Sequence, residues 1–392
     1  MAKLLIASDE YIFRNNGQYF FKSQEWQDFY RRYLRVFEEL RIATRVIEEP
    51  DLKQGRVLVD DSRIEILPIP LFHGPSQYAK TYFSVGKAMK DAVRGCDAAV
   101  LRLPSTVAQR ISKQVLKSGM PFATEIVFAA CDGAETSNTW LEKTIWRIID
   151  RKMRNICTKA DGVSCVTEKY LQKRYFSVKP GHFESYYSTL NLDKGFFTAP
   201  RRYPNKDVFT IAHIDLQIGL HSRKGTDMII KALARLKKEQ GITVNVKFAG
   251  DDWDNSTEKI MNFAKALGIE EQVECVGMLS RSEVNSFLDN ADLFVLPTKA
   301  EGLPRVIIEA IAKGLPTITT PVSGNPELIS DDYLVPINDV ETLAIKIGRL
   351  VSDKEEYERV SKINYEHSLQ YMGSSLQGRR DEFYGQLKTR VK

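Results

Sequence analysis

Two acidic residues eight positions apart, Glu301 and Glu309, are the side chains of this sequence whose setting best suits chemistry. They lie in the segment KAEGLPRVIIEAIAKGLPTITT, residues 299–320, in which Gly-Leu-Pro follows Glu301 directly. Glycine lets the backbone approach a ligand closely, and proline suits the first turn of a helix, whose free amides attract oxyanions and hydroxyls. Two carboxylates beside such a turn can accept charge-assisted hydrogen bonds from the hydroxyls of a sugar or a ribose.

The elements around this segment place it at an edge that binds ligands. Residues 293–296 (LFVL) predict a buried strand, and residues 306–312 predict a helix. The segment therefore follows the carboxyl end of a strand, which is where open α/β sheets bind their ligands. Glu309 lies about two helical turns after Glu301, so we expect both carboxylates to face the same side.

The whole second half of the chain alternates strands with helices. Apolar runs predict strands at residues 208–214, 244–249, 273–276, 293–296 and 317–319, with helical patterns between them. This alternation is typical of a parallel sheet covered on both faces, and the first half repeats it less regularly. The aperiodic residues 177–206 are the expected connection. We therefore place two domains at residues 1–200 and 201–392, with the alternative open that the last helix packs back on the first domain.

A second candidate loop, Ser-Arg-Lys-Gly at residues 222–225, precedes a predicted helix. Lys224 lies at the start of that helix, where the helix dipole disfavours a cation, so a functional role is favoured over a surface position. The run GLHSRKG has its lysine and glycine in the wrong order for a P-loop, and we reject that interpretation.

Several ordered segments together resemble a known family. They are the Glu301…Glu309 arrangement, SRKG at 222–225, FAGD at 248–251, VGMLS at 276–280 and GNPE at 324–327. Over residues 205–350, and in outline before them, the chain resembles the retaining glycosyltransferases of family four, which have the GT-B fold. The resemblance implies an α/β protein of two doubly wound Rossmann-like domains facing across a cleft. It implies that the first domain binds the acceptor and the second binds a nucleotide-sugar donor.

The resemblance also implies roles for individual residues. Glu309 would hold the donor ribose, and Glu301 would hold the transferred sugar together with neighbouring backbone. Lys224 would neutralise the diphosphate, which stabilises the leaving group without a metal as the glycosidic bond breaks. The catalytic candidates are thus Glu301 and Lys224. The donor-binding candidates are Glu309, Gly302, Leu303, Pro304, Arg305, Arg223 and Gly17.

Three positions bear on how far the family pattern holds. Family members place an arginine five residues before the lysine, but that position is Gly219 here, and Arg223 or Arg305 would have to replace it. A histidine that the family often supplies from the first domain is absent from residues 123–132 (ATEIVFAACD). Gly17 follows the first strand, where the family has a glycine loop, and an ordinary turn is an equal alternative.

Composition excludes several classes of protein. With 43% hydrophobic and 27% charged residues, the chain is neither fibrous nor largely disordered. No apolar run reaches the roughly 18–20 residues that span a bilayer, and the start is too soon acidic for a signal peptide. The five cysteines form no CxxC pair, so neither a disulfide framework nor a zinc site is expected. A cytoplasmic setting follows, with the inner face of the membrane as an alternative.

The net charge of +5 is too mild to suggest a nucleic-acid partner, but its distribution is uneven. Residues 1–200 hold 30 Lys and Arg against 23 Asp and Glu, whereas residues 201–392 hold 26 against 28. Two aromatic and basic stretches, residues 19–35 and 140–154, contribute to this excess. Two interpretations stay open: they seat the first domain on an anionic membrane, or they pack on their own sheet with solvated basic tips.

Other chemistries have weaker support. The Asp-Trp-Asp at residues 252–254 has the pattern of a metal site but is better explained as surface-loop carboxylates. An isolated histidine is more often structural than a base, so His73, His182 and His213 are assigned no role. A sugar-nucleotide epimerase and a two-domain sugar-binding protein are the alternatives; no GxGxxG supports a dehydrogenase.

The favoured function is metal-independent hexosyl transfer with retention, without a cofactor, in cell-surface polysaccharide or glycolipid biosynthesis. The expected partners are a nucleotide-sugar and a glycan or lipid-linked acceptor.

Overall fold

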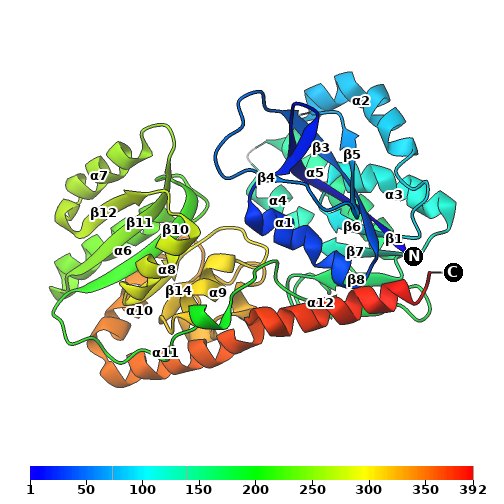
Figure 1. Ribbon diagram of the computed structural model, residues 1–392. Coiled ribbons are helices and arrows are strands. Elements are labelled where there is room, and N and C mark those ends of the chain that lie inside the picture. The colour runs from blue at the N-terminus through cyan, green and yellow to red at the C-terminus, as the bar shows by residue number, and fades with distance from the viewer. Residues whose placement is uncertain (73, 138, 392) are drawn as a thin grey trace. The chain divides into compact units, whose positions relative to one another are not determined.

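The structure is a computed structural model that describes residues 1–72, 74–137 and 139–391. The chain forms two compact units (Figure 1). Unit 1 comprises Met1–Tyr187 together with the last segment of the chain, which begins at Gln377, and unit 2 comprises Ser188–Leu376.

Unit 1 is built on a mainly parallel sheet whose centre is the long strand β1 (Lys3–Asn15). Parallel strands extend from β1 on both sides, with β3 and then β5 on one side and β6, β7, β8 and β9 on the other. Their bounds are Glu39–Glu48 (β3), Ile64–Ile69 (β5), Ala98–Leu103 (β6), Phe122–Ile126 (β7), Gly162–Cys165 (β8) and Phe183–Tyr186 (β9). Two antiparallel strands, β2 (Gln18–Phe21) and β4 (Val57–Leu58), continue from the distal half of β1.

Helices cover both faces of this sheet. On one face, α3 (Thr106–Ser118) contacts β1 and β6, and also contacts α2 (Gly74–Lys90) and α5 (Trp140–Cys157). Thr124 of β7 points to this face, since its hydroxyl lies 3.7 Å from the Cys157 sulfur. The neighbouring Glu125 points to the opposite face, where α1 (Gln24–Arg31), the 3₁₀ turn η1 (Tyr33–Arg35) and the last helix α12 (Gly373–Lys388) supply its surroundings. A short helix α4 (Ala130–Thr136) packs on α5.

A buried carboxylate fastens the last helix to the sheet. Glu125 accepts hydrogen bonds from Tyr33 at 2.9 Å, from Arg102 of β6 at 3.0 Å and from Tyr187 at 3.0 Å, and it also accepts one from Tyr384 of α12. Burial, reinforced by the Glu125 charge, raises the pKa of Tyr33 and of Tyr384 well above the ordinary phenol range. Both phenols therefore stay protonated and donate, which compensates the burial of the carboxylate.

Unit 2 is a doubly wound domain on a fully parallel sheet of order β12-β11-β10-β13-β14. The strands are β10 (Phe209–Ile218), β11 (Val244–Asp252), β12 (Val273–Gly277), β13 (Leu293–Leu296) and β14 (Thr317–Thr319). The helices are α6 (Thr226–Gln240), α7 (Ser256–Ala266), α8 (Arg281–Asp289), α9 (Arg305–Ala312), α10 (Val340–Ser352) and α11 (Lys354–Ser368). Every strand predicted in this half is present, because its apolar periodicity is regular.

The division between the units differs from the boundary expected at residue 200. Residues after Tyr187 already belong to unit 2: the Thr198 amide donates to the carbonyl of Ala312 at 3.2 Å, and the Leu192 carbonyl accepts from the Gly373 amide at 2.9 Å. At the other end, the segment from Gln377 returns to unit 1 with its aromatic residues, and Phe383 packs against Phe183 of β9. The expected second domain of 201–392 is therefore too long at its end and too short at its start.

The two aromatic and basic stretches, residues 19–35 and 140–154, form different secondary structures. Residues 19–35 do not form one amphipathic helix: they divide among β2, α1 and η1, and Phe29, Tyr30 and Tyr33 are buried in unit 1. Residues 140–154 do form a helix, α5, which has an exposed side. Across the described ranges, no helix combines the length and the apolar character that crossing a bilayer requires.

Candidate functional site

Two loops at the carboxyl edge of the unit 2 sheet bring the expected residues together. Residues 219–225 connect β10 to α6, and residues 297–304 connect β13 to α9. Because β10 and β13 are hydrogen-bonded neighbours in a parallel sheet, both loops leave the same edge side by side.

The two loops touch through their backbones. Gly225 has a φ of +80°, and a Cβ there would lie 2.4 Å from the carbonyl oxygen of Pro297, so only glycine fits. The carbonyl of Arg223 accepts hydrogen bonds from the Lys299 amide at 2.8 Å and from the Thr298 hydroxyl at 3.2 Å. These contacts fix the register of one loop against the other.

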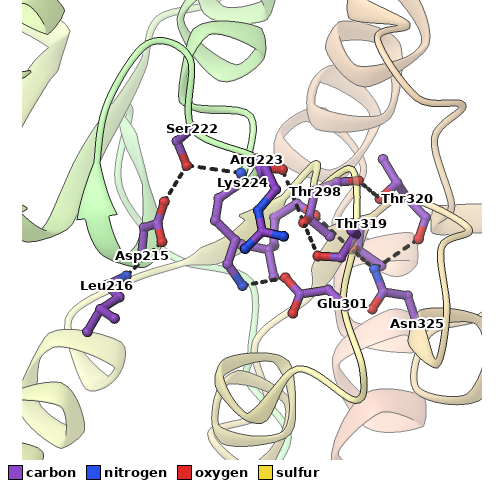
Figure 2. A network of polar contacts seen from close by, with 12 residues as sticks. Asp215, Leu216, Ser222, Arg223, Lys224, Thr298, Glu301, Thr319, Thr320 and Asn325 are labelled. Carbon is purple, nitrogen blue, oxygen red and sulfur yellow. Dashed lines mark hydrogen bonds and ion pairs between the residues drawn. The ribbon is translucent and has the colours of Figure 1, made fainter. Parts of the chain in front are cut away.

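Lys224 and Glu301 form an ion pair across the junction (Figure 2). The ammonium group donates to Oε1 of the carboxylate, and the two side chains are 24% and 11% exposed. Lys224 and Glu301 lie 77 positions apart in two separate sequence motifs, and the fold makes them direct partners. A partly desolvated pair of this kind keeps both charges at defined positions beside solvent.

A second pair, missed by the sequence analysis, holds the lysine loop. The hydroxyl of Ser222 donates to the carboxylate of Asp215 and accepts a hydrogen bond from the Lys224 amide at 3.0 Å. The other Asp215 oxygen accepts from the Leu216 amide at 2.7 Å. Asp215 lies near the carboxyl end of β10, and this polar residue at the end of an apolar run was the signal that could have identified it.

Buried threonines and an asparagine hold the loop of residues 297–304, which carries Glu301, through hydrogen bonds. The Asn325 side-chain amide donates to the Thr319 hydroxyl at 2.9 Å and to the Thr320 carbonyl at 3.0 Å, and the Thr320 hydroxyl donates to the carbonyl of Thr298. The amide of Gly324 donates to the carbonyl of Gly302 at 3.0 Å. The GNPE segment, noted for its family resemblance, therefore positions the loop that carries Glu301.

Helix α9 begins at Arg305, so the spacing of the two glutamates is only partly helical. Leu303 and Pro304 are buried at its start, and Gly302 precedes them in the loop. Glu301 lies before the helix and Glu309 lies within it, one turn after Arg305, on the side that the helix does not bury. The expectation that two full helical turns separate the carboxylates is therefore wrong, although both belong to one loop–helix unit.

The remaining candidates divide between the two units. Arg223 is exposed, and its side chain extends alongside Lys224 in Figure 2. Gly219 closes a turn by accepting from the Ser222 amide at 3.0 Å, so this chain has no cation at that position. Gly17 lies in unit 1 with a φ of +80°, in the two-residue turn between β1 and β2, which accounts for the glycine without a ligand.

Comparison with known proteins gives a family match for most of unit 2. Residues 219–367 match the sequence model of the family described as glycosyl transferases group 1. This part of the chain is therefore similar to that family. The site loops at residues 219–225 and 297–304 lie within the matched range.

Curated relatives and solved structures are also similar to this chain. CapJ of Staphylococcus aureus is 25% identical over 83% of this chain and 81% of its own length. The putative colanic acid biosynthesis glycosyltransferase WcaL of Escherichia coli is 34% identical, but over only 33% of either chain. Sucrose-phosphate synthase from Thermosynechococcus elongatus has a TM-score of 0.74 at 16% identity, with 99% of this chain and 100% of that chain covered. HepE of Anabaena, in complex with UDP-glucose, has a TM-score of 0.67 at 14% identity, with 97% and 99% covered.

The expected fold class is thereby confirmed: the chain has the GT-B fold, with two Rossmann-like units. The roles assigned to individual residues stay predictions, as does retention of the anomeric configuration.

The Asp-Trp-Asp at residues 252–254 serves the local fold. Asp252 accepts from the Ser256 hydroxyl at 2.9 Å and the Thr257 amide at 3.0 Å, and so caps α7, while Asp254 pairs with Lys259 at 2.6 Å. Within residues 1–72, 74–137 and 139–391, no three His, Cys, Asp or Glu side chains cluster closely enough to hold a metal. His73 lies outside the described residues.

His213, beneath the lysine loop, is completely buried in β10. Its Nδ1–H donates to the Val295 carbonyl of β13 at 2.9 Å, so the ring joins the two strands that carry the site. Burial lowers the pKa of His213 to about 4, with Asp215 opposing this shift and Lys224 adding to it. The imidazole is therefore neutral in the folded protein at neutral pH.

We predict that unit 2 loses stability as the pH falls from about 6.5 to about 4. The unfolded chain binds a proton on His213 at about pH 6.5, whereas the folded protein resists protonation, so acid favours unfolding by up to about 3 kcal/mol. Hydrogen exchange of the β10 and β13 amides across this range measures the effect. His213→Gln should flatten the pH profile and His221→Gln, at an exposed histidine, should not; an unchanged profile in His213→Gln would contradict the prediction.

Proposed function

We propose that this protein is a retaining, metal-independent hexosyltransferase that moves a sugar from a nucleotide-sugar to a glycan or lipid-linked acceptor. The observation that carries the proposal is the Lys224–Glu301 pair at the carboxyl edge of unit 2. It supplies a fixed cation for a diphosphate and, next to it, a carboxylate for sugar hydroxyls.

The chemistry of the reaction matches this pair. When the glycosidic bond breaks, negative charge grows on the departing nucleoside diphosphate, and a cation held in place stabilises that charge without reorganisation. In the free protein Glu301 is the anionic partner of Lys224. A bound diphosphate would take over that partnership, and the Glu301 carboxylate would then accept hydrogen bonds from the sugar.

The rest of the site supports a donor of this shape. Glu309, on α9, is the candidate for the ribose hydroxyls, and the Gly302–Pro304 backbone is the candidate for the sugar. Arg223 and Arg305 are exposed beside the site and are the candidates for a second diphosphate cation in place of Gly219. The complex of HepE with UDP-glucose supports a nucleotide-sugar as the donor class.

The names of the relatives support a place in cell-surface polysaccharide synthesis. WcaL is named for colanic acid biosynthesis, and AmsK of Erwinia amylovora, 34% identical over 141 residues, for amylovoran biosynthesis. Both align with this chain over about a third of their own length. The acceptor class is inferred from their names alone.

Replacing the cation should impair the chemical step. Lys224→Met should lower kcat by roughly 10²–10³-fold, the cost of removing one preorganised group from a developing oxyanion. Lys231→Met is the matched control, because Lys231 lies in α6 outside the two site loops and pairs with Asp227 of the same helix at 2.7 Å. Release of nucleoside diphosphate from a panel of UDP-, GDP- and ADP-sugars measures the rate, and wild-type rates in Lys224→Met would refute the assignment.

The two glutamates should affect different parts of the donor. Glu309→Ala should lower the affinity for nucleoside diphosphate and for nucleotide-sugar alike, by about 10- to 100-fold, because one charged hydrogen bond is lost. Glu301→Ala should lower the affinity for the nucleotide-sugar. The affinity for the free nucleoside diphosphate should equal or exceed that of the wild type, because Glu301 no longer competes for Lys224. Isothermal titration calorimetry measures the two affinities for each variant, and Glu355→Ala, at an exposed glutamate of α11, is the control. Equal losses for both ligands in both variants would contradict these separate roles.

Activity should persist in a chelator. Lys224 is proposed to carry the charge stabilisation that a divalent ion supplies in other enzymes, so excess EDTA should leave the initial rate of transfer unchanged. Loss of activity that is restored by Mg²⁺ or Mn²⁺ would overturn metal independence and direct attention to Asp252 and Asp254.

A further inference from the structure

The positive charge of unit 1 is concentrated in one helical layer. Helices α2, α3 and α5, which cover one face of the sheet, together hold eleven Lys and Arg against two Asp and Glu, a net charge of +9. Neither α2 nor α3 contains an acidic residue. Of the two acids in α5, Asp150 is buried and paired with Arg174 at 2.5 Å.

The helices on the opposite face have no such excess. Taken together, α1 and α12 hold four basic and four acidic residues. Several of these charges pair with neighbours, as Lys388 does with Glu38 at 2.6 Å. The asymmetry therefore belongs to a face of the folded unit rather than to the chain as a whole.

Large apolar side chains project from the same charged layer. Phe83 of α2 is 87% exposed, and Trp140, Leu141 and Ile148 of α5 are 77%, 55% and 49% exposed. Phe83 lies on a helical stripe with Lys80, Lys87 and Lys90, which are spaced at three and four residues. On α5 the second tryptophan, Trp146, is different, because it packs on α4 against Gly133.

The layer of α2, α3 and α5 is continuous, and the lysines of α2 and α3 can bind an external anion. Helix α3 contacts both α2 and α5, and the Arg110 guanidinium joins α3 to α2 by donating to the Tyr82 carbonyl at 2.9 Å. Lys113 and Lys117 continue the positive surface along the exposed side of α3. In the part of the chain that the structure describes, the lysines of α2 and α3 form no ion pair. Their charge is therefore not neutralised within the protein.

We infer that the α2–α3–α5 face of unit 1 docks on an anionic lipid bilayer. Lysines above an anionic surface each add attraction within a Debye length, and exposed aromatic side chains enter the interface between headgroups and acyl chains. Phe83 and Trp140 are the insertion candidates, and the lysine stripes of α2 and α3 supply the long-range attraction. This surface goes beyond the proposed sugar transfer, which needs only a donor and an acceptor.

The mixture of residues favours a bilayer over a soluble polyanion. A polyanionic glycan would be satisfied by the charges alone and would leave Phe83 and Trp140 exposed to water. A bilayer uses both features, because its surface is charged and its interior is apolar. The apolar residues therefore decide between the two partners.

Sedimentation of the full chain with vesicles tests the inference. Binding is expected to vesicles of phosphatidylcholine with phosphatidylglycerol, to be weak with phosphatidylcholine alone, and to fall as salt rises from about 0.1 M to about 1 M. The triple variant Lys87→Glu, Lys113→Glu, Lys117→Glu should lower partitioning on the order of 100-fold, from about fivefold for each lysine. The matched control reverses three exposed lysines of unit 2, Lys238→Glu, Lys265→Glu and Lys354→Glu, and should bind like wild type.

The double variant Phe83→Ser, Trp140→Ser distinguishes an anionic bilayer from a soluble polyanion as the partner. It should reduce vesicle binding at least tenfold while leaving retention on immobilised heparin unchanged. Full vesicle binding by this variant would mean that the face attracts polyanions in general, and absence of wild-type binding at low salt would equally overturn the inference. The thermal shift caused by nucleotide-sugars monitors unit 2 separately, so failure of membrane docking and failure of the proposed transfer are distinguishable.

Discussion

The close approach of two backbone loops is the constraint on which the donor site depends. Gly225 has no room for a Cβ because the Pro297 carbonyl would lie 2.4 Å from it, and its φ of +80° excludes most other residues independently. That contact brings Arg223 within hydrogen-bonding distance of Thr298 and Lys299, and so sets where the next side chain, Lys224, can reach. The roles proposed for Lys224 and Glu301 depend on this junction.

The ion pair at the junction has a consequence for binding. Lys224 and Glu301 neutralise each other in the free protein, so neither charge is left uncompensated in a partly buried site. The exchange of Glu301 for a diphosphate would replace one anionic partner of the lysine with another. Recognition of the sugar would then be linked to recognition of the diphosphate, since the carboxylate becomes available only when the cation has a new partner.

The parts of the structure that sequence could predict are those governed by local periodicity. The strands of unit 2 and the segment that carries Glu301 follow from regular apolar runs and Gly-Pro signals. Asp215, Thr319 and Asn325 could not be found, because short polar residues act here through partners from other segments. The return of α12 to unit 1 likewise depends on Glu125 and Tyr384, which are 259 positions apart and carry no local signal.

The charge of the protein shows why the fold is needed to interpret composition. A net charge of +5 suggests little, and division at residue 200 only locates the excess in one half. Right-handed crossovers place α2, α3 and α5 on one side of the unit 1 sheet, and this sorting concentrates +9 on a single face beside exposed Phe83 and Trp140. In unit 2 the charges of Lys224 and Glu301 are matched as an ion pair between two loops. The charges of this chain are therefore arranged in two ways. In unit 2 a compensated ion pair suits a small anionic ligand, and in unit 1 an uncompensated basic surface suits an extended anionic one.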